Sequence, residues 1–152
     1  MDDTSFIQEG ELMGNNMELG YEMFCYQCEQ TAGGKGCTKL GVCGKTPEIA
    51  GLQDLLIFQI KGISCYAKTF IEQEQHVDKS IVTFIENALF TTLTNVNFDA
   101  DAHVKLLRQS QEIKETLKSS VGEINNPTYH ATYKLPNDKN EMLKDAYIAG
   151  IM

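Results

Sequence analysis

The longest amphipathic pattern in the chain predicts a helix from about Thr46 to about Glu74. Its start has the composition of a helix N-terminus, because Thr46 suits the N-cap, Pro47 the first helical position and Glu48 the positive end of the helix dipole. The apolar residues that follow, spaced by three and four, are Ile49, Leu52, Leu56, Ile60, Ile63, Ala67 and Phe70. This spacing is that of one helix face, so we expect the stripe to be buried against other helices.

Two further helices are predicted by the same spacing, one over residues 78–95 and one that begins at Asp99 or Asp101 and ends near Val121. The residues expected to face inward in the first are Ile81, Phe84, Ile85, Ala88 and Leu89. In the second they are Val104, Leu107, the aliphatic stem of Lys114, Leu117 and Val121. Gly122 follows where a C-cap glycine is common, which supports an end of this helix at Val121.

The last part of the chain is less regular. The segment 125–136 shows no sustained spacing, and we expect it to be irregular, with a short extended piece at residues 131–135. A last helix is predicted from Asp138, because Asp138 and Glu141 have the spacing of a capping box. Its apolar residues are Met142, Leu143, Ala146, Ile148 and Ala149, and the chain then stops at Gly150, Ile151 and Met152. An apolar ending without a polar tail suggests a truncated protein.

The two N-terminal segments show neither a helix nor a strand pattern. Residues 1–22 contain scattered glycine and asparagine, and we expect them to be a flexible leader. Residues 23–45 are crowded with cysteine and glycine, which indicates a folded loop that something other than hydrophobic packing stabilises. The predicted fold class is therefore mainly α: a helical bundle over residues 23–152 with an N-terminal Cys/Gly-rich loop at 23–45.

Charge and composition narrow the partners and the compartment. The net charge is −8 and the sequence pI is about 4.8, which disfavours nucleic acid and anionic membrane surfaces as partners. There is no apolar run long enough to span a bilayer and no basic and apolar secretory signal. We therefore expect a cytoplasmic protein. In a reducing compartment, five cysteines indicate metal binding or redox chemistry before structural disulfides.

Four of these cysteines lie in the loop with the spacing C-x2-C-x8-C-x5-C, and they are Cys25, Cys28, Cys37 and Cys43. A two-residue spacer lets both sulfurs of the first pair face the same site. The glycines between the cysteines allow tight turns and expose backbone N–H groups that can point at sulfur. Flanking aromatic and basic residues can exclude water and balance negative charge; these are Phe24, Tyr26, Lys35, Lys39 and Lys45. The pattern predicts a metal centre with four thiolate ligands.

Spacing alone leaves three kinds of site open. An iron–sulfur cluster explains four cysteines in one compact, glycine-rich loop. A structural zinc site needs the same four thiolates in tetrahedral array, but zinc ribbons usually repeat a C-x2-C pair, and the second pair here has a five-residue spacer. A disulfide framework requires an oxidising compartment, for which the sequence carries no signal.

The remaining candidate residues are weaker. Cys65 falls within the long predicted helix, where a small, partly buried core residue is the simpler interpretation than a redox thiol. The histidines His76, His103 and His130 share no ligand motif, and we interpret each as a helix-end or surface residue. The carboxylates Glu72, Glu74, Glu112 and Glu115 are expected to be solvated on helix faces. No catalytic residue is assigned.

The loop and the helix after it carry a family resemblance. The segment MFCYQCEQTAGGKGCTKLGVCGKTPEIAGLQDLLIFQIKGIS resembles the N-terminus of the hybrid cluster proteins, also called prismane proteins or hydroxylamine reductases. The resemblance continues through ALFTTLTNVNFDADA at residues 88–102 and covers the chain after the leader. The words FCYQCEQT and LFTTLTNVNFD are much more specific than a cysteine spacing.

The resemblance implies a [4Fe–4S] cluster on the matching positions Cys25, Cys28, Cys37 and Cys43. Some members carry a [2Fe–2S] cluster on wider spacing, and this chain resembles the cubane type. Family members are several times longer and bind a second, hybrid iron–sulfur–oxo cluster through one histidine, two glutamates and several cysteines in later domains. After Cys43 only Cys65 remains in this sequence, so we expect the hybrid cluster only in the missing part.

The function implied is that of the N-terminal, electron-accepting domain of a hydroxylamine reductase, with an external electron donor as partner. The full-length parent would reduce hydroxylamine with two electrons to ammonia and water, or handle related nitric-oxide chemistry, and this chain alone is expected not to be catalytic. A second interpretation is a stand-alone helical module that binds a cluster or zinc for stability and docks a partner. A third is a free-standing, ferredoxin-like electron carrier.

Overall fold

The computed structural model describes residues 23–151, with side chains described as far as Tyr147. The leader expected at residues 1–22 lies outside the described residues. The elements are a short 3-10 helix, η1 (Ala32–Gly34), and the helices α2 (Pro47–Glu72), α3 (Lys79–Thr91), α4 (Ala100–Val121), α5 (Tyr129–Thr132) and α6 (Lys139–Ile151). Within residues 23–151 there is no strand, only an isolated bridge between Cys25 and Cys37. The prediction of a mainly α fold is confirmed.

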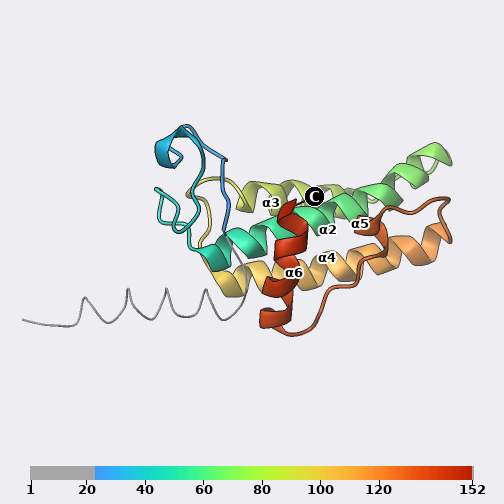
Figure 1. Cartoon of the computed structure of the whole chain (residues 1–152). Helices are drawn as coiled ribbons and strands as arrows, with labels where there is room; N and C mark the ends of the chain where they lie inside the picture. Colours follow the sequence, from blue (N-terminus) through green and yellow to red (C-terminus); the bar gives the residue numbers. More distant parts are fainter. Residues whose placement is uncertain (1–22, 152) are drawn as a thin grey trace, which may run out of the picture.

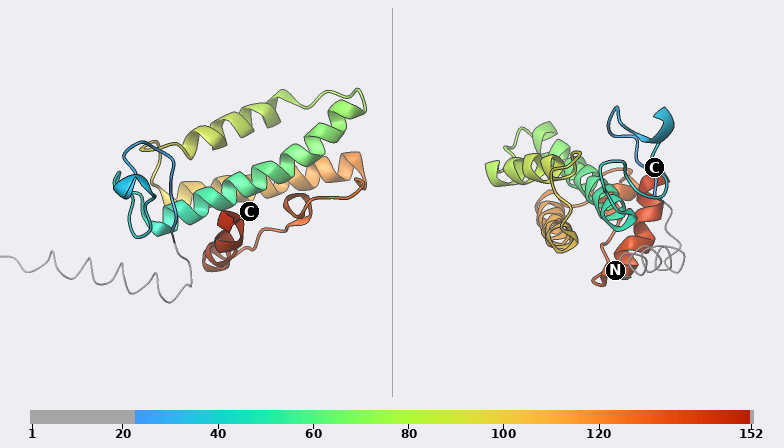
Figure 2. Two further views of the ribbon diagram at one scale, coloured as in Figure 1. Left: turned by 45° about the horizontal axis from the view of Figure 1, so that its top comes forward. Right: turned by 90° about the vertical axis from the view of Figure 1, so that its left-hand side faces the viewer.

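Helix α2 is the centre of the bundle (Figure 2). It begins as predicted, because the Thr46 hydroxyl accepts a hydrogen bond from the Ile49 amide at 3.3 Å and Pro47 occupies the first helical position. It packs along α4 and also against α5 and α6. The core shared by these helices includes Leu52, Leu55, Leu56, Ile63, Leu107, Leu117, Met142 and Ala146. The Cys/Gly-rich loop covers the N-terminal end of α2 (Figure 1).

Aspartate caps start the other long helices. Asp78 Oδ1 accepts from the Ser80 amide at 2.7 Å, and Asp99 Oδ1 accepts from the amides of Asp101 and Ala102 at 2.9 and 3.1 Å. Asp138 Oδ1 accepts from the Glu141 amide at 3.2 Å, as the capping-box spacing predicts. These caps fix where the helices begin because they satisfy amide groups that have no partner inside the helix.

Helix α3 is shorter and less buried than predicted. It ends at Thr91, and residues 92–96 form turns that include Asn95 at φ 62°. Phe84 and Ala88 are buried, but Leu89, which we expected to face inward, is 41% exposed. That expectation was wrong because α3 makes only a limited contact with α2, so its apolar stripe is wider than the contact that covers it.

The segment after α4 also differs from the prediction. Instead of an extended piece over residues 131–135, Ala131 and Thr132 complete helix α5, and the chain becomes extended at Tyr133. Gly62 in α2 permits this arrangement, since a Cβ at that position would lie 2.3 Å from the carbonyl oxygen of His130. The missing side chain lets the backbone of α5 contact α2 directly. Sequence spacing within 125–136 carries no sign of this contact.

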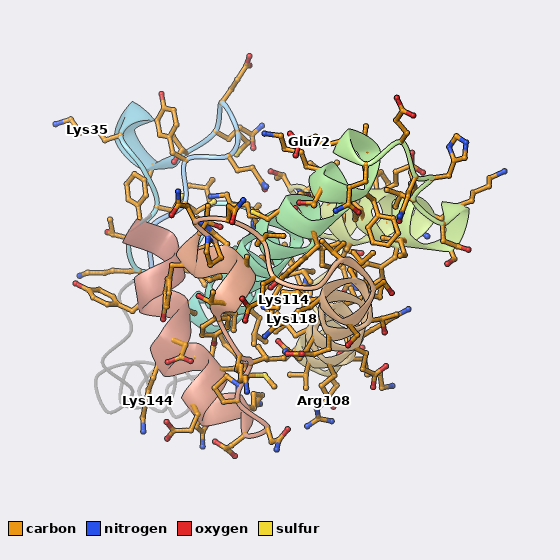
Figure 3. All side chains as sticks on the ribbon, turned by 90° about the vertical axis from the view of Figure 1, so that its right-hand side faces the viewer. Lys35, Glu72, Arg108, Lys114, Lys118 and Lys144 are labelled. Atoms are coloured by element: carbon orange, nitrogen blue, oxygen red, sulfur yellow. The ribbon has the colours of Figure 1, made fainter. Side chains whose placement is uncertain are left out.

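Lys114 of α4 holds this segment in place. Its whole side chain is buried at 1% exposure, whereas only the aliphatic stem was expected to be. Nζ donates to Gln59 Oε1 at 2.6 Å and to the carbonyl oxygens of Tyr133 and His130 at 2.5 and 3.5 Å. Burial lowers the pKa of Lys114 to about 8. Figure 3 shows Lys114 among the helices, while charged residues such as Lys35, Arg108 and Lys144 lie at the periphery.

None of the helices between residues 23 and 151 is long and apolar enough to cross a membrane.

Candidate metal centre

The first and third cysteines of the motif are joined through their backbones. The Cys25 amide donates to the Cys37 carbonyl at 3.0 Å, and the Cys37 amide donates to the Cys25 carbonyl at 2.9 Å. This antiparallel bridge closes the eleven-residue segment between them, which contains Cys28 and η1. Cys25 and Cys37, two predicted ligands that are twelve positions apart in the sequence, therefore lie side by side.

Thr31 connects the first three cysteines. Its amide donates to the Cys28 carbonyl at 3.3 Å, and its hydroxyl donates to the Cys25 carbonyl at 3.1 Å. The same hydroxyl lies 3.6 Å from the Sγ of Cys37. Thr31 is buried although it sits in an irregular loop. Thr31 belongs to the motif FCYQCEQT, but nothing in its residue type indicated that it would connect the cysteines.

The sulfur of Cys37 is surrounded by hydrogen-bond donors. The Ala32 amide approaches its Sγ at 3.4 Å, and the residue is buried. Hydrogen bonds from the backbone amides of Ala32 and Val42 lower the pKa of the Cys37 thiol, and the Thr31 hydroxyl acts in the same direction. Backbone N–H groups directed at a thiolate are the interaction expected of a ligand sulfur. The glycine-rich loop thus favours the ionised form that binds metal.

Cys43 lies in the turn that leads into α2. The Gly41 amide donates to the Lys45 carbonyl at 2.8 Å, and the Gly44 amide donates to the Gly41 carbonyl at 2.8 Å. A Cβ on Gly41 would lie 3.2 Å from the Sγ of Cys43, so the absence of a side chain leaves room for that sulfur. Lys45 is 3% exposed, and its Nζ donates to Gln27 Oε1 at 3.3 Å. Gln27 stands between Cys25 and Cys28, so the buried charge of Lys45 lies beside the first cysteine pair.

Hydrogen bonds join Cys25, Cys28 and Cys37, and Cys43 lies in the following turn of the same loop; all four are free thiols. Among the described side chains, no three from His, Cys, Asp or Glu converge to hold a single metal ion. A tetrahedral zinc would need four sulfurs about 2.3 Å from one centre. A [4Fe–4S] cluster takes four thiolates spread around a larger body, and the number and type of donors fit that group.

A cavity of about 180 Å³ lies between the loop, α2 and the start of the α3–α4 connection. Its wall includes Cys25, Gln27, Lys45, Gln53 and Thr92. Gln53 is almost fully buried, and its Nε2 donates to the Asn97 carbonyl at 3.3 Å. These polar residues come from segments far apart in the sequence, and the sequence interpretation found only Cys25 and Lys45 among them.

The other candidate residues lie away from the four thiols. Cys65 is half-buried in α2, with its Sγ 3.2 Å from Thr128 Oγ1. It lies about 27 Å along the helix from Pro47, so it cannot share a site with the loop. This fits the partly buried core residue that was predicted. The carboxylates Glu72, Glu74, Glu112 and Glu115 are all exposed, as expected.

The histidines take structural positions. His76 is exposed, and His130 stacks on Phe58 with ring centroids 4.4 Å apart. His103 lies at a helix end, as predicted, but is completely buried. Its Nδ1 lies 2.6 Å from the Asp99 carbonyl and its Nε2 3.2 Å from Gln53 Nε2. Since the amide nitrogen only donates, Nε2 accepts and the proton is on Nδ1.

Comparison with known proteins gives a consistent result. The profile of the Prismane/CO dehydrogenase family matches residues 23–152. The chain is 47% identical over 105 residues to the hydroxylamine reductase of Bacteroides thetaiotaomicron, covering 69% of this chain and 19% of that protein. It is 39% identical over 130 residues to the hydroxylamine reductase of Bacteroides fragilis, covering 86% and 23%, and 40% identical over 129 residues to that of Zymomonas mobilis, covering 85% and 24%. The chain spans a quarter or less of these relatives.

Proposed function

Because the chain belongs to the Prismane/CO dehydrogenase family, we propose that it is the electron-accepting part of a hydroxylamine reductase. In this proposal Cys25, Cys28, Cys37 and Cys43 hold a [4Fe–4S] cluster, and an external donor in the cytoplasm supplies its electrons. The observation that carries the proposal is the loop itself. Four free thiols lie in one loop, where the Cys25–Cys37 bridge closes the segment with the first three and Cys43 follows in the next turn, within the residues that the family profile matches.

The chain's own residues would hold the cluster and adjust its environment. When bound, the cluster supplies one-electron transfer. The backbone amides of Ala32 and Val42 stabilise a thiolate at Cys37, which favours ligation. The ammonium group of Lys45, buried beside the first cysteine pair, offsets negative charge on the thiolates and so favours the reduced state.

We propose that the complete reaction uses parts of the relatives that this chain does not match. Reduction of hydroxylamine, NH2OH + 2 electrons + 2 H⁺ → NH3 + H2O, is assigned here to the full-length relatives by their name alone. The family resemblance implies a second cluster with several cysteine ligands, and after Cys43 this sequence contains only Cys65. We therefore assign electron acceptance to this chain and no catalytic residue.

A redox titration under anaerobic conditions tests this role. The chain reconstituted with iron and sulfide is expected to be brown, to bleach when reduced, and to regain its colour on reoxidation. It is also expected to show no turnover of hydroxylamine by itself. A colourless protein that takes one zinc and no electrons would overturn the proposal and leave a structural module.

A further inference from the structure

The turn between α3 and α4 lies directly beside the cysteine loop (Figure 1). The turn lies within LFTTLTNVNFD, the second motif that carries the family resemblance. The proposed electron transfer gives this motif no role. Its residues Thr92 and Thr94 follow the cysteine pair by more than 60 positions. The contacts between the two segments nevertheless pass through one side chain, that of Gln27.

Gln27 stands between Cys25 and Cys28 and uses both ends of its amide. Its Nε2 donates to the Thr92 carbonyl at 2.9 Å. Its Oε1 accepts from Thr94 Oγ1 at 3.1 Å and from Lys45 Nζ at 3.3 Å. With donor and acceptor both engaged, rotation of the amide is prevented. Gln27 is one of the two residues between Cys25 and Cys28. It thereby joins the first cysteine pair to the turn that leads into α2 and to the turn between α3 and α4.

The partners of Gln27 depend on it because they are buried. Thr92 and Lys45 are each 3% exposed, whereas Gln27 itself is exposed and shares the wall of the cavity with them. Removing the Gln27 amide would leave the Lys45 ammonium and the Thr92 carbonyl, both on buried residues, without these hydrogen bonds. Such a loss costs more than the loss of an exposed hydrogen bond.

The turn is fixed to the bundle on its other side. Gln53 of α2 donates to the Asn97 carbonyl at 3.3 Å, and its Nε2 also lies 3.2 Å from the buried His103 at the start of α4. The turn is therefore attached to the helices through Gln53 and to the cysteine loop through Gln27. A rigid link runs from the core of the bundle to the first cysteine pair.

From these contacts we propose that Gln27, together with Thr92 and Thr94, is a positioning element that holds Cys25 and Cys28 in place for the cluster and keeps the Lys45 ammonium beside them. This rests on the proposed function in so far as it concerns the cluster. Gln27 does not bind metal. It acts through the backbone of the cysteine pair and through Lys45.

The test compares Gln27→Leu, which keeps the size but removes all three hydrogen bonds, with Gln30→Leu, a matched change at an exposed glutamine of the same loop. In the reconstituted chain, Gln27→Leu should release iron to a chelator about 10-fold faster than Gln30→Leu. Its reduction potential should also fall, because Lys45 is no longer held near the cluster. Thr94→Val, which removes one hydrogen bond, should give a smaller increase in release. Release at the control rate, or an unchanged potential, would overturn the proposal.

A second measurement separates this inference from the proposed function. If the unmutated chain takes up no cluster, the proposed function fails, and amide hydrogen exchange of the metal-free chain decides the role of Gln27. The positioning element then predicts faster exchange of the Cys25 and Cys37 amides in Gln27→Leu than in Gln30→Leu. Equal exchange in the two variants would overturn the inference.

Discussion

Cys25 and Cys37 form a two-way backbone bridge, each donating its amide to the carbonyl of the other at 3.0 and 2.9 Å. Two predicted ligands are thus paired by protein contacts alone. The loop that carries them is held by Thr31, by the turn before α2 and by Gln27, none of which depends on hydrophobic packing. Hydrogen bonds of the loop therefore prepare part of the site for the metal group that we propose.

The first prediction concerns the four ligands. Cys25→Ser should lose most of the iron taken up by the reconstituted chain, because a serine hydroxyl is a poor replacement for a thiolate at iron. Cys65→Ser is the matched control, since Cys65 lies in α2 away from the loop. Iron per chain and visible absorbance measure the outcome. Equal losses in the two variants would contradict the assignment.

The second prediction concerns Gly36. Its φ of 142° is a conformation that side chains rarely adopt, and a Cβ there would lie 2.4 Å from Cε2 of Phe24. Gly36→Ala should therefore destabilise the loop by about 1–3 kcal/mol. In the metal-free chain this should appear as exchange of the Cys37 amide that is about 10-fold faster or more.

Gly33→Ala provides the comparison for this prediction. Gly33 also has a positive φ, of 59°, but nothing lies within 4 Å of its Cβ position. The left-handed conformation alone should cost about 1–2 kcal/mol. A larger effect at Gly33 than at Gly36 would show that the contact with Phe24 is unimportant.

The third prediction concerns the pH dependence of stability. Burial lowers the pKa of Lys114 from 10.5 to about 8, and the neighbouring charge of Lys118 acts in the same direction while Glu115 opposes it. Between these two pH values the unfolded chain binds more protons at this residue than the folded chain, so its contribution to the free energy of unfolding rises with pH. The full rise in the contribution of Lys114 to the free energy of unfolding is on the order of 3 kcal/mol.

Denaturant unfolding of the chain and of Lys114→Met at pH 7 and pH 10 measures this contribution. Relative to the variant, the unmutated chain should gain stability between the two pH values. At pH 7 the variant leaves Gln59 Oε1 and the Tyr133 carbonyl without the Lys114 donor, a loss of about 1–3 kcal/mol that the removal of a buried charge partly offsets. Parallel pH profiles would contradict the account of Lys114.

The fourth prediction concerns the exposed apolar residues at the end of α3 and in the turn after it. Phe90 is 62% exposed, and Leu93 and Phe98 are also exposed. Exposed apolar side chains gathered in one stretch of the chain promote association. The chain should self-associate at high concentration, and Phe90→Glu should reduce this in sedimentation experiments. A sharp monomer peak at high concentration for the unmutated chain would contradict it.

Local patterns in the sequence were enough to predict the four longer helices of residues 23–151 and to single out the candidate ligands. The Thr46 cap with Pro47 predicted the start of α2, and the Asp99 and Asp138 caps were found in the same way. The four cysteines stood out by spacing, since their chemistry lies in one short segment. Such features are visible in sequence because the residues that interact are only a few positions apart.

Contacts between distant residues could not be predicted in this way. No pattern links Gln27 to Thr92, because they are 65 positions apart and meet only when α3 and α4 are packed on α2. The short helix α5 depends on the close approach that Gly62 permits, and Leu89 was misplaced because spacing does not show how much of a stripe is covered. The burial of Lys114 depends on acceptors supplied by Gln59 and Tyr133 in other segments.

The central claim is that the four loop cysteines hold an iron–sulfur cluster that accepts electrons. The most direct test is anaerobic preparation of the chain, followed by iron, sulfide and zinc analysis and an EPR spectrum of the reduced protein. The account predicts about four irons and four sulfides per chain, with a reduced-state signal that Cys25→Ser abolishes. One zinc per chain, with no colour and no EPR signal, would contradict it.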